Sequence, residues 1–158
     1  MRIDTPLLVV GRGPAALVVA KLAAGRSIPC LLAGHEVLGD DAPIELSEAA
    51  VDVLTTHGVL DVLRPHLIAP APVTITTRDF EEVVKHHCVA DLNVTVYDEI
   101  TVVDRQFGDD GGEAVLTDGR SRWELHADHF VDADLLPGDV SAAIVAGAAT
   151  VERLASQS

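Results

Sequence analysis

The sequence predicts an α/β domain in which a parallel sheet lies between helices and a three-stranded antiparallel meander. Two patterns indicate this fold. Residues 7–33 follow a strand-turn-helix-strand pattern, and residues 100–126 hold three strand candidates joined by glycine-containing turns. The length agrees, because 158 residues correspond to about one domain. Since no internal repeat or linker divides the chain, we expect a single domain over residues 1–158.

The first element is the apolar run Leu7–Val10, which has no polar alternation and is typical of a strand buried on both faces. A turn follows, and apolar spacing then predicts a helix over residues 14–24. Pro14 is tolerated in the first turn of that helix, and Gly25 ends it. Residues 28–33 form a second buried strand. This unit predicts a right-handed crossover and a parallel strand pair.

The middle of the chain alternates between loops and short elements. Residues 34–45 contain several glycines, aspartates and a proline, which indicate a loop. Ser47 precedes a helical pattern that ends near Gly58. The remaining elements expected here are a helical turn over 59–66, an extended connection over 67–72, a strand over 73–77 and a helix over 78–88.

The second half is rich in strand candidates. Asp-Gly and Gly-Gly pairs supply the positive φ angles of tight hairpins, and they separate the strands of the predicted meander. The expected strands lie at 93–97, 100–107, 113–117, 122–126 and, as one more buried strand, 129–133. An Ala/Val-rich helix over 140–155 closes the chain.

Charge and composition exclude several classes of partner. The chain has 25 acidic and 11 basic residues, a formal net charge of −14 at pH 7. This charge repels phosphate backbones and anionic lipid, so we expect no nucleic acid and no membrane as partner. Gly11–Pro14 interrupts the apolar stretch 7–24, whereas a membrane span needs about 20 continuous apolar residues. With two cysteines and no visible signal peptide, we expect a cytoplasmic protein.

Other polar clusters give weak signals. His86–Cys88 are consecutive, and neighbouring helix positions point about 100° apart, so no metal site is expected. His126, His129, Asp132 and Asp134 lie near a predicted strand boundary, but acid-base catalysis also needs a pocket and a partner. No nucleophile motif and no redox C-x-x-C pair occurs. Catalytic residues are therefore left unassigned.

The most informative motif is Gly11–Ala16, which matches G-x-G-x-x-G/A between a predicted strand and a predicted helix. Gly11 permits the tight turn, and Gly13 lets a pyrophosphate approach the backbone. Ala16 lets the helix pack close to the strand. The N-terminus of the helix then offers N–H groups and partial positive charge to the phosphates. The motif predicts a dinucleotide-binding, Rossmann-like fold, in which the turn either binds a nucleotide or keeps only its shape.

The segment Leu8–Leu17 resembles the start of FAD-dependent oxidoreductases, above all the aromatic-hydroxylase and glutathione-reductase-like groups, whose opening reads VVGAGPAGL. Later pieces follow in the family's order. They are Pro29–Leu32, Val53–Leu63, Thr77–Glu81, the meander with Ala127–Val131, and Pro137–Val140. The resemblance implies an FAD/NAD(P)-binding domain trimmed to its nucleotide-binding core, with FAD as cofactor and NAD(P) as a possible one.

The resemblance also implies which residues bind the cofactor. Gly11, Arg12, Gly13, Pro14, Ala15 and Ala16 would hold the pyrophosphate, Glu36 would reach a ribose, and Gly138 with Asp139 would approach the ribitol. The bound flavin would carry the redox chemistry of a monooxygenase-like oxidoreductase.

Departures from the family keep a second function open. Gly34 stands where the family has the acid that binds the ribose, and only two residues separate Asp134 from Pro137, where the family has a substrate domain. The chain could therefore be a catalytically silent relic that binds a partner, as a homodimer or as a subunit of a larger oxidoreductase. A plain NAD(P)-binding Rossmann domain is a third reading, which the meander disfavours.

Overall fold

The computed structural model describes residues 2–37 and 39–157. Its main sheet has six strands in the order β6-β2-β1-β9-β8-β7. The strands β6, β2, β1 and β9 run parallel, whereas β8 and β7 continue the sheet antiparallel. The strands are β1 (Arg2–Val10), β2 (Cys30–Ala33), β6 (Val94–Tyr97), β7 (Thr101–Gly108), β8 (Gly111–Thr117) and β9 (Arg122–Asp132). This arrangement confirms the predicted α/β fold and the meander.

One strand prediction was wrong, because the two strands expected at 122–126 and 129–133 are a single strand, β9. Its first part pairs with β8 from Arg122 to Ala127, and from Glu124 to Asp132 it pairs with β1. The break was expected at Ala127 and Asp128. The chain stays extended there because β1 pairs alongside it, Thr5 with Ala127 and Leu7 with His129. The meander is therefore joined directly to the parallel sheet.

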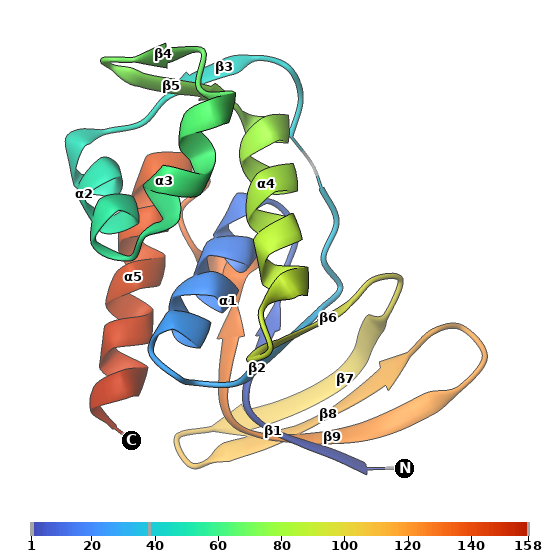
Figure 1. Cartoon of the computed structure of the whole chain (residues 1–158). Helices are drawn as coiled ribbons and strands as arrows, with labels where there is room; N and C mark the ends of the chain where they lie inside the picture. Colours follow the sequence, from blue (N-terminus) through green and yellow to red (C-terminus); the bar gives the residue numbers. More distant parts are fainter. Residues whose placement is uncertain (1, 38, 158) are drawn as a thin grey trace.

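Helices lie on one face of this sheet: α1 and α4 contact its strands, α5 packs against α1, and α2 and α3 pack against α5 and α4 farther out (Figure 1). The helices are α1 (Pro14–Gly25), α2 (Glu48–Thr56), α3 (Val59–Leu63), α4 (Thr77–Ala90) and α5 (Val140–Ser156), with the short 3-10 helices η1 (Arg64–His66) and η2 (Ala133–Leu135). Side-chain oxygens of Ser47, Thr76 and Asp139 cap α2, α4 and α5. Each predicted helix is present. Within the described ranges, no helix has the length and apolarity needed to cross a membrane.

The sheet has a separate apolar core on each face, because successive side chains of a strand point to opposite sides. On β1, Leu7 and Val9 belong to the larger cluster under the helices, whereas Leu8 belongs to the smaller cluster on the other face. Leu116 of β8 and Leu125 of β9 complete that smaller cluster. The meander thus covers the face that the helices leave open.

A second, three-stranded sheet lies at the top of Figure 1, with the order β3-β5-β4. It consists of β3 (Pro43–Glu45), β4 (Ala69–Pro70) and β5 (Val73–Thr76). The strand at β5 was predicted, but 34–45 was expected to be entirely loop and 67–72 a plain connection. Both segments carry short strands because they pair with β5. β3 reaches β5 from about 30 residues away in the chain, whereas β4 and β5 form a tight hairpin, with Pro70 opposite Val73.

Candidate nucleotide-binding site

The glycine turn between β1 and α1 has the conformation that its sequence predicts. Gly11 has a φ of +144° and Gly13 a φ of +84°, backbone conformations that residues other than glycine rarely adopt. A Cβ on Gly11 would lie 2.8 Å from the Cβ of Ala133, so the turn also needs glycine for close packing. Gly13 is the N-cap residue of α1 and contributes no side chain to the helix terminus.

Two hydrogen bonds fix this turn to neighbouring strand ends. The N–H of Arg12 donates to the carboxylate of Asp134, at 3.2 Å, and the N–H of Gly13 donates to the carbonyl of Glu36, at 3.0 Å. The first turn of α1 contains no acidic residue, and among the residues that the structure describes no side chain caps the helix. Its N-terminus therefore keeps the partial positive charge and the unpaired amide groups that favour an anion.

A pocket of about 420 Å³ opens beside the turn. Its lining comes from the ends of β1 and β2, the glycine turn, the start of β7 and η2, and includes Gly11, Arg12, Gly34, Arg105 and Asp134. This is the carboxyl edge of the parallel strands, where ligands bind in open α/β sheets. The volume falls within the range of roughly 300–1,000 Å³ typical of small-molecule sites.

The ribose end of the expected site departs from the family's pattern. Gly34 follows β2 with a φ of +68° and carries no side chain toward the pocket. The carboxylate of Glu36 lies 3.8 Å from the guanidinium of Arg12, and both side chains are exposed. Glu36 is thus placed beside the turn, with its carbonyl bound to Gly13 and its carboxylate facing Arg12. Its contact with a ribose stays a prediction.

Gly138 and Asp139 lie at the N-terminus of α5 and are not among the residues that line the pocket. The carboxylate of Asp139 accepts a hydrogen bond from the N–H of Ala142, at 2.9 Å, and so caps α5. Helix capping is a sufficient reason for an Asp at this position, and it does not require a ligand. Their contact with a ribitol also stays a prediction.

The site contains a polar chain that the sequence did not reveal. Arg105 of β7 donates to Asp132 at the end of β9, at 2.8 Å, and the other oxygen of Asp132 accepts from the N–H of Asp134, at 3.0 Å. The guanidinium of Arg105 also lies over the ring of Phe130, 5.0 Å from its centroid. These contacts fix the position of Asp134, which in turn accepts the hydrogen bond from the N–H of Arg12 in the glycine turn. Its members come from two strands that are not neighbours in the sheet, so no sequence spacing connects them.

His35 is a second unpredicted feature, immediately after Gly34. Its side chain is buried beside the backbone of Gly13, and within residues 2–37 and 39–157 neither ring nitrogen makes a hydrogen bond of good geometry. Burial, with a further effect from the positive charge of Lys85, lowers the pKa of His35 below its usual 6.5. The imidazole beside the glycine turn is therefore neutral at neutral pH. A buried His in a loop carries no periodic signal that could have indicated it.

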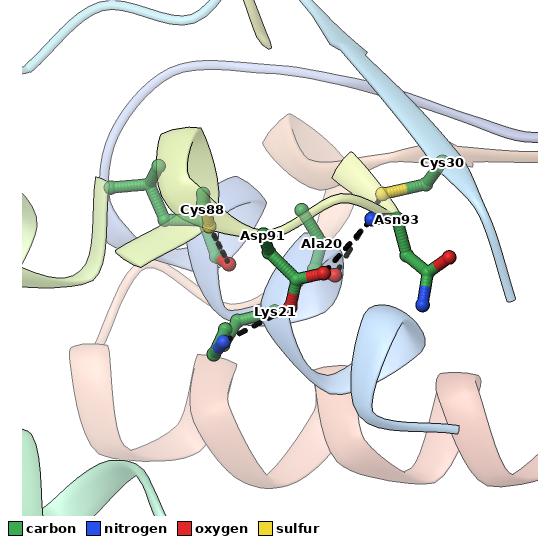
Figure 2. A network of polar contacts seen from close by, with 7 residues as sticks. Ala20, Lys21, Cys30, Cys88, Asp91 and Asn93 are labelled. Atoms are coloured by element: carbon green, nitrogen blue, oxygen red, sulfur yellow. Dashed lines mark hydrogen bonds and ion pairs between the residues drawn. The ribbon is translucent and has the colours of Figure 1, made fainter. Parts of the chain in front are cut away.

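The two cysteines lie in the core between β2, α1 and α4. The thiol of Cys30 donates to the carbonyl of Ala20, and that of Cys88 to the carbonyl of Leu17 (Figure 2). Burial raises the pKa of each thiol to about 12. Since thiolates are the reactive form, these cysteines are structural at neutral pH. In the described part of the chain, no group of three or more His, Cys, Asp or Glu side chains could hold a metal ion.

Figure 2 also shows an ion pair that joins α1 to the segment before β6. Lys21 lies 3.1 Å from a carboxylate oxygen of Asp91, whose other oxygen accepts from the N–H of Asn93 at 2.9 Å. The hydrogen bond from Asn93, followed by the interaction with Lys21, lowers the pKa of Asp91 below its usual value. Asp91 thus orders the turn that leads into β6.

We expect Asp91→Asn to destabilise the protein at pH 7 and to matter less in acid. The folded pKa of Asp91 lies below the unfolded value of about 3.9. The stabilisation is therefore fully present above the unfolded pKa and is lost as the pH falls through the folded pKa. The urea midpoints of the parent protein and of Asp91→Asn, measured from pH 7 to pH 3, should converge as the pH falls.

The matched control is Asp61→Asn, because the carboxylate of Asp61 lies in an exposed ion pair with Arg64. A difference that stays constant with pH would contradict this assignment.

Comparison with known proteins gives a structural match and no sequence match. No protein-family model matches the sequence, and no curated protein matches it. p-Nitrophenol 4-monooxygenase from Pseudomonas putida superposes with a TM-score of 0.65 at 14% identity, covering 83% of this chain and 40% of that one. The flavin-dependent monooxygenase PieE, solved with FAD and substrate, gives 0.68 at 15%, covering 81% and 30%.

Anhydrotetracycline hydroxylase from Streptomyces rimosus gives a TM-score of 0.67 at 13% identity, covering 84% of this chain and 32% of that chain. The chain thus spans 30–40% of the length of these three proteins. At such low sequence identity, the structural similarity establishes the fold but not the activity. The chain has the Rossmann-like α/β fold of flavin-dependent monooxygenases and hydroxylases.

Proposed function

We propose that this chain binds a dinucleotide cofactor at the glycine turn and serves as the cofactor domain of an oxidoreductase. The observation that carries the proposal is the uncapped N-terminus of α1, which meets a pocket of about 420 Å³ at the carboxyl edge of the sheet. FAD is the first cofactor to test, because the fold is that of flavin-dependent monooxygenases and one of them was solved with FAD. NAD(P) is the alternative.

The phosphate end of the site fits a pyrophosphate. Gly13 has no Cβ to block approach, and the first-turn amides of α1 carry partial positive charge with no acidic neighbour on that turn. The hydrogen bonds to Asp134 and Glu36 hold the turn in shape before any ligand arrives. A bound flavin would supply the redox chemistry, and the protein would orient it. The role of this chain's own residues is thus to hold the phosphates.

The first test is the visible absorption spectrum of the purified protein, repeated after adding excess FAD and desalting. We expect a retained flavin band, and its loss in Gly13→Val, because a side chain at this position blocks the phosphates. Gly13→Val also strains the backbone at a φ of +84°. Pro14→Asp therefore serves as a second variant. An acid in the first turn favours the helix but repels phosphate.

Circular dichroism checks the fold of both variants. If both variants fold and retain as much flavin as the parent protein, the phosphates bind elsewhere and the site is wrong. A protein that retains no FAD and shows no thermal shift with NAD(P) would refute cofactor binding altogether.

A catalytically silent interaction module is the second candidate function. It is favoured by Gly34 in place of the ribose-binding acid and by Leu135, whose side chain is 83% exposed in the turn after β9. An exposed leucine in this place suits contact with another protein or a second copy. This candidate predicts a colourless protein whose oligomeric mass by light scattering falls on Leu135→Ser.

A further inference from the structure

The ribose end of the candidate site has no acidic side chain at the end of β2, where Gly34 stands, and has the cation Arg12 beside that position. We infer that, between nicotinamide dinucleotides, the site selects the one whose adenosine ribose carries a phosphate, NADP(H), over NAD(H). The inference rests on the proposed function, since it concerns the same pocket. It is carried by Gly34 and Arg12, which line that pocket together.

The first argument is the missing carboxylate at the end of β2. An Asp or Glu at this place accepts hydrogen bonds from the ribose hydroxyls, and it repels a phosphate there. Gly34 provides neither effect, and its φ of +68° is a conformation that an acidic residue would rarely adopt. The end of β2 therefore lacks this group, and the carboxylate of Glu36, two residues later, faces Arg12.

The second argument is the cation that lies beside this gap. The side chain of Arg12 is 57% exposed, and its guanidinium lies 3.8 Å from the carboxylate of Glu36. That distance is long for an ion pair, and water screens it, so the pair is weak. A phosphate carries more charge than a carboxylate, and two of its oxygens can accept the parallel hydrogen bonds of a planar guanidinium. Arg12 can thus leave the carboxylate of Glu36 and bind a ribose phosphate with little loss of free energy.

Arg12 is the cation of the pocket that remains available for this role. Arg105 also lines the pocket, but it is held at 2.8 Å by Asp132, whose side chain is only 11% exposed, and by the ring of Phe130. The carboxylates of Asp104 and Asp134 line the pocket as well and oppose any anion. Binding of a ribose phosphate should therefore depend strongly on Arg12.

The test compares two probes that differ only in the ribose phosphate, adenosine 2′,5′-bisphosphate and adenosine 5′-monophosphate, by isothermal titration calorimetry. NADP⁺, NAD⁺ and FAD are titrated in parallel. We expect adenosine 2′,5′-bisphosphate and NADP⁺ each to bind at least about tenfold more tightly than adenosine 5′-monophosphate and NAD⁺, respectively. A tenfold difference in affinity corresponds to the free energy of one charge-assisted hydrogen bond. Arg12→Gln should remove this preference.

The matched control is Arg64→Gln, because Arg64 is equally exposed and also lies in a surface ion pair, with Asp61. It should leave both affinities unchanged. Equal or tighter binding of the unphosphorylated ligand in either pair would overturn the inference and leave cofactor binding intact. A preference that survives Arg12→Gln would also overturn it. Failure of all five ligands to bind would instead refute the proposed function itself.

Discussion

Replacing Gly11 by alanine should lower the free energy of unfolding by about 3 kcal/mol. The new Cβ would lie 2.8 Å from the Cβ of Ala133 and 3.2 Å from the backbone nitrogen of Asp134. Its φ of +144° adds backbone strain, because this region is essentially reserved for glycine. The two effects act together, since relieving the contact would move the turn away from η2.

Gly25→Ala is the matched control, because it makes the same change at the other end of α1. No atom lies within 4 Å of its added Cβ, and Gly25 has no positive φ. Alanine there should be neutral or stabilise the helix by up to about 1 kcal/mol. Urea unfolding followed by circular dichroism measures both variants. Equal free energies for Gly11→Ala and the parent protein would show that the contact with η2 is not tight.

The glycine turn could be predicted from sequence because its determinants are local. Gly11 and Gly13 have positive φ angles within one short segment, and Pro14 begins the helix that follows. The same holds for most helices, whose caps and apolar spacing lie within a few residues. Ser47, for example, accepts a hydrogen bond from the N–H of Ala50, just three residues later.

What the sequence could not indicate depends on contacts between distant segments. β9 is continuous through Ala127 because β1 pairs with it, and the short strand β3 exists through its pairing with β5, about 30 residues later in the chain. The same reason applies to the site. Asp134 is 122 positions from Arg12 in the chain, and their hydrogen bond requires the end of β9 to lie beside the end of β1. A one-dimensional pattern does not encode such a contact.

The second large effect is expected in the helical layer. Phe80→Ala should lower the free energy of unfolding by about 3–5 kcal/mol, the usual cost of removing a buried phenyl ring. Phe80 is 0% exposed and belongs to the cluster that holds α4 against α1 and the sheet. A whole domain is stable by about 5–15 kcal/mol, so this one change removes a large share. Val89→Ala, on the same helix but 62% exposed, should change stability by at most about 0.5 kcal/mol.

The single tryptophan makes this experiment informative about both faces of the sheet. Trp123 packs against the smaller cluster under the meander, whereas Phe80 lies in the larger cluster under the helices. If the sheet couples the two cores, Trp123 fluorescence and helical circular dichroism should give the same urea midpoint in the parent and in Phe80→Ala. A fluorescence midpoint that stays at the parent value in Phe80→Ala would mean that the meander unfolds independently. Coincident midpoints are expected, because β1 and β9 contribute side chains to both clusters and cannot lose one core while keeping the other.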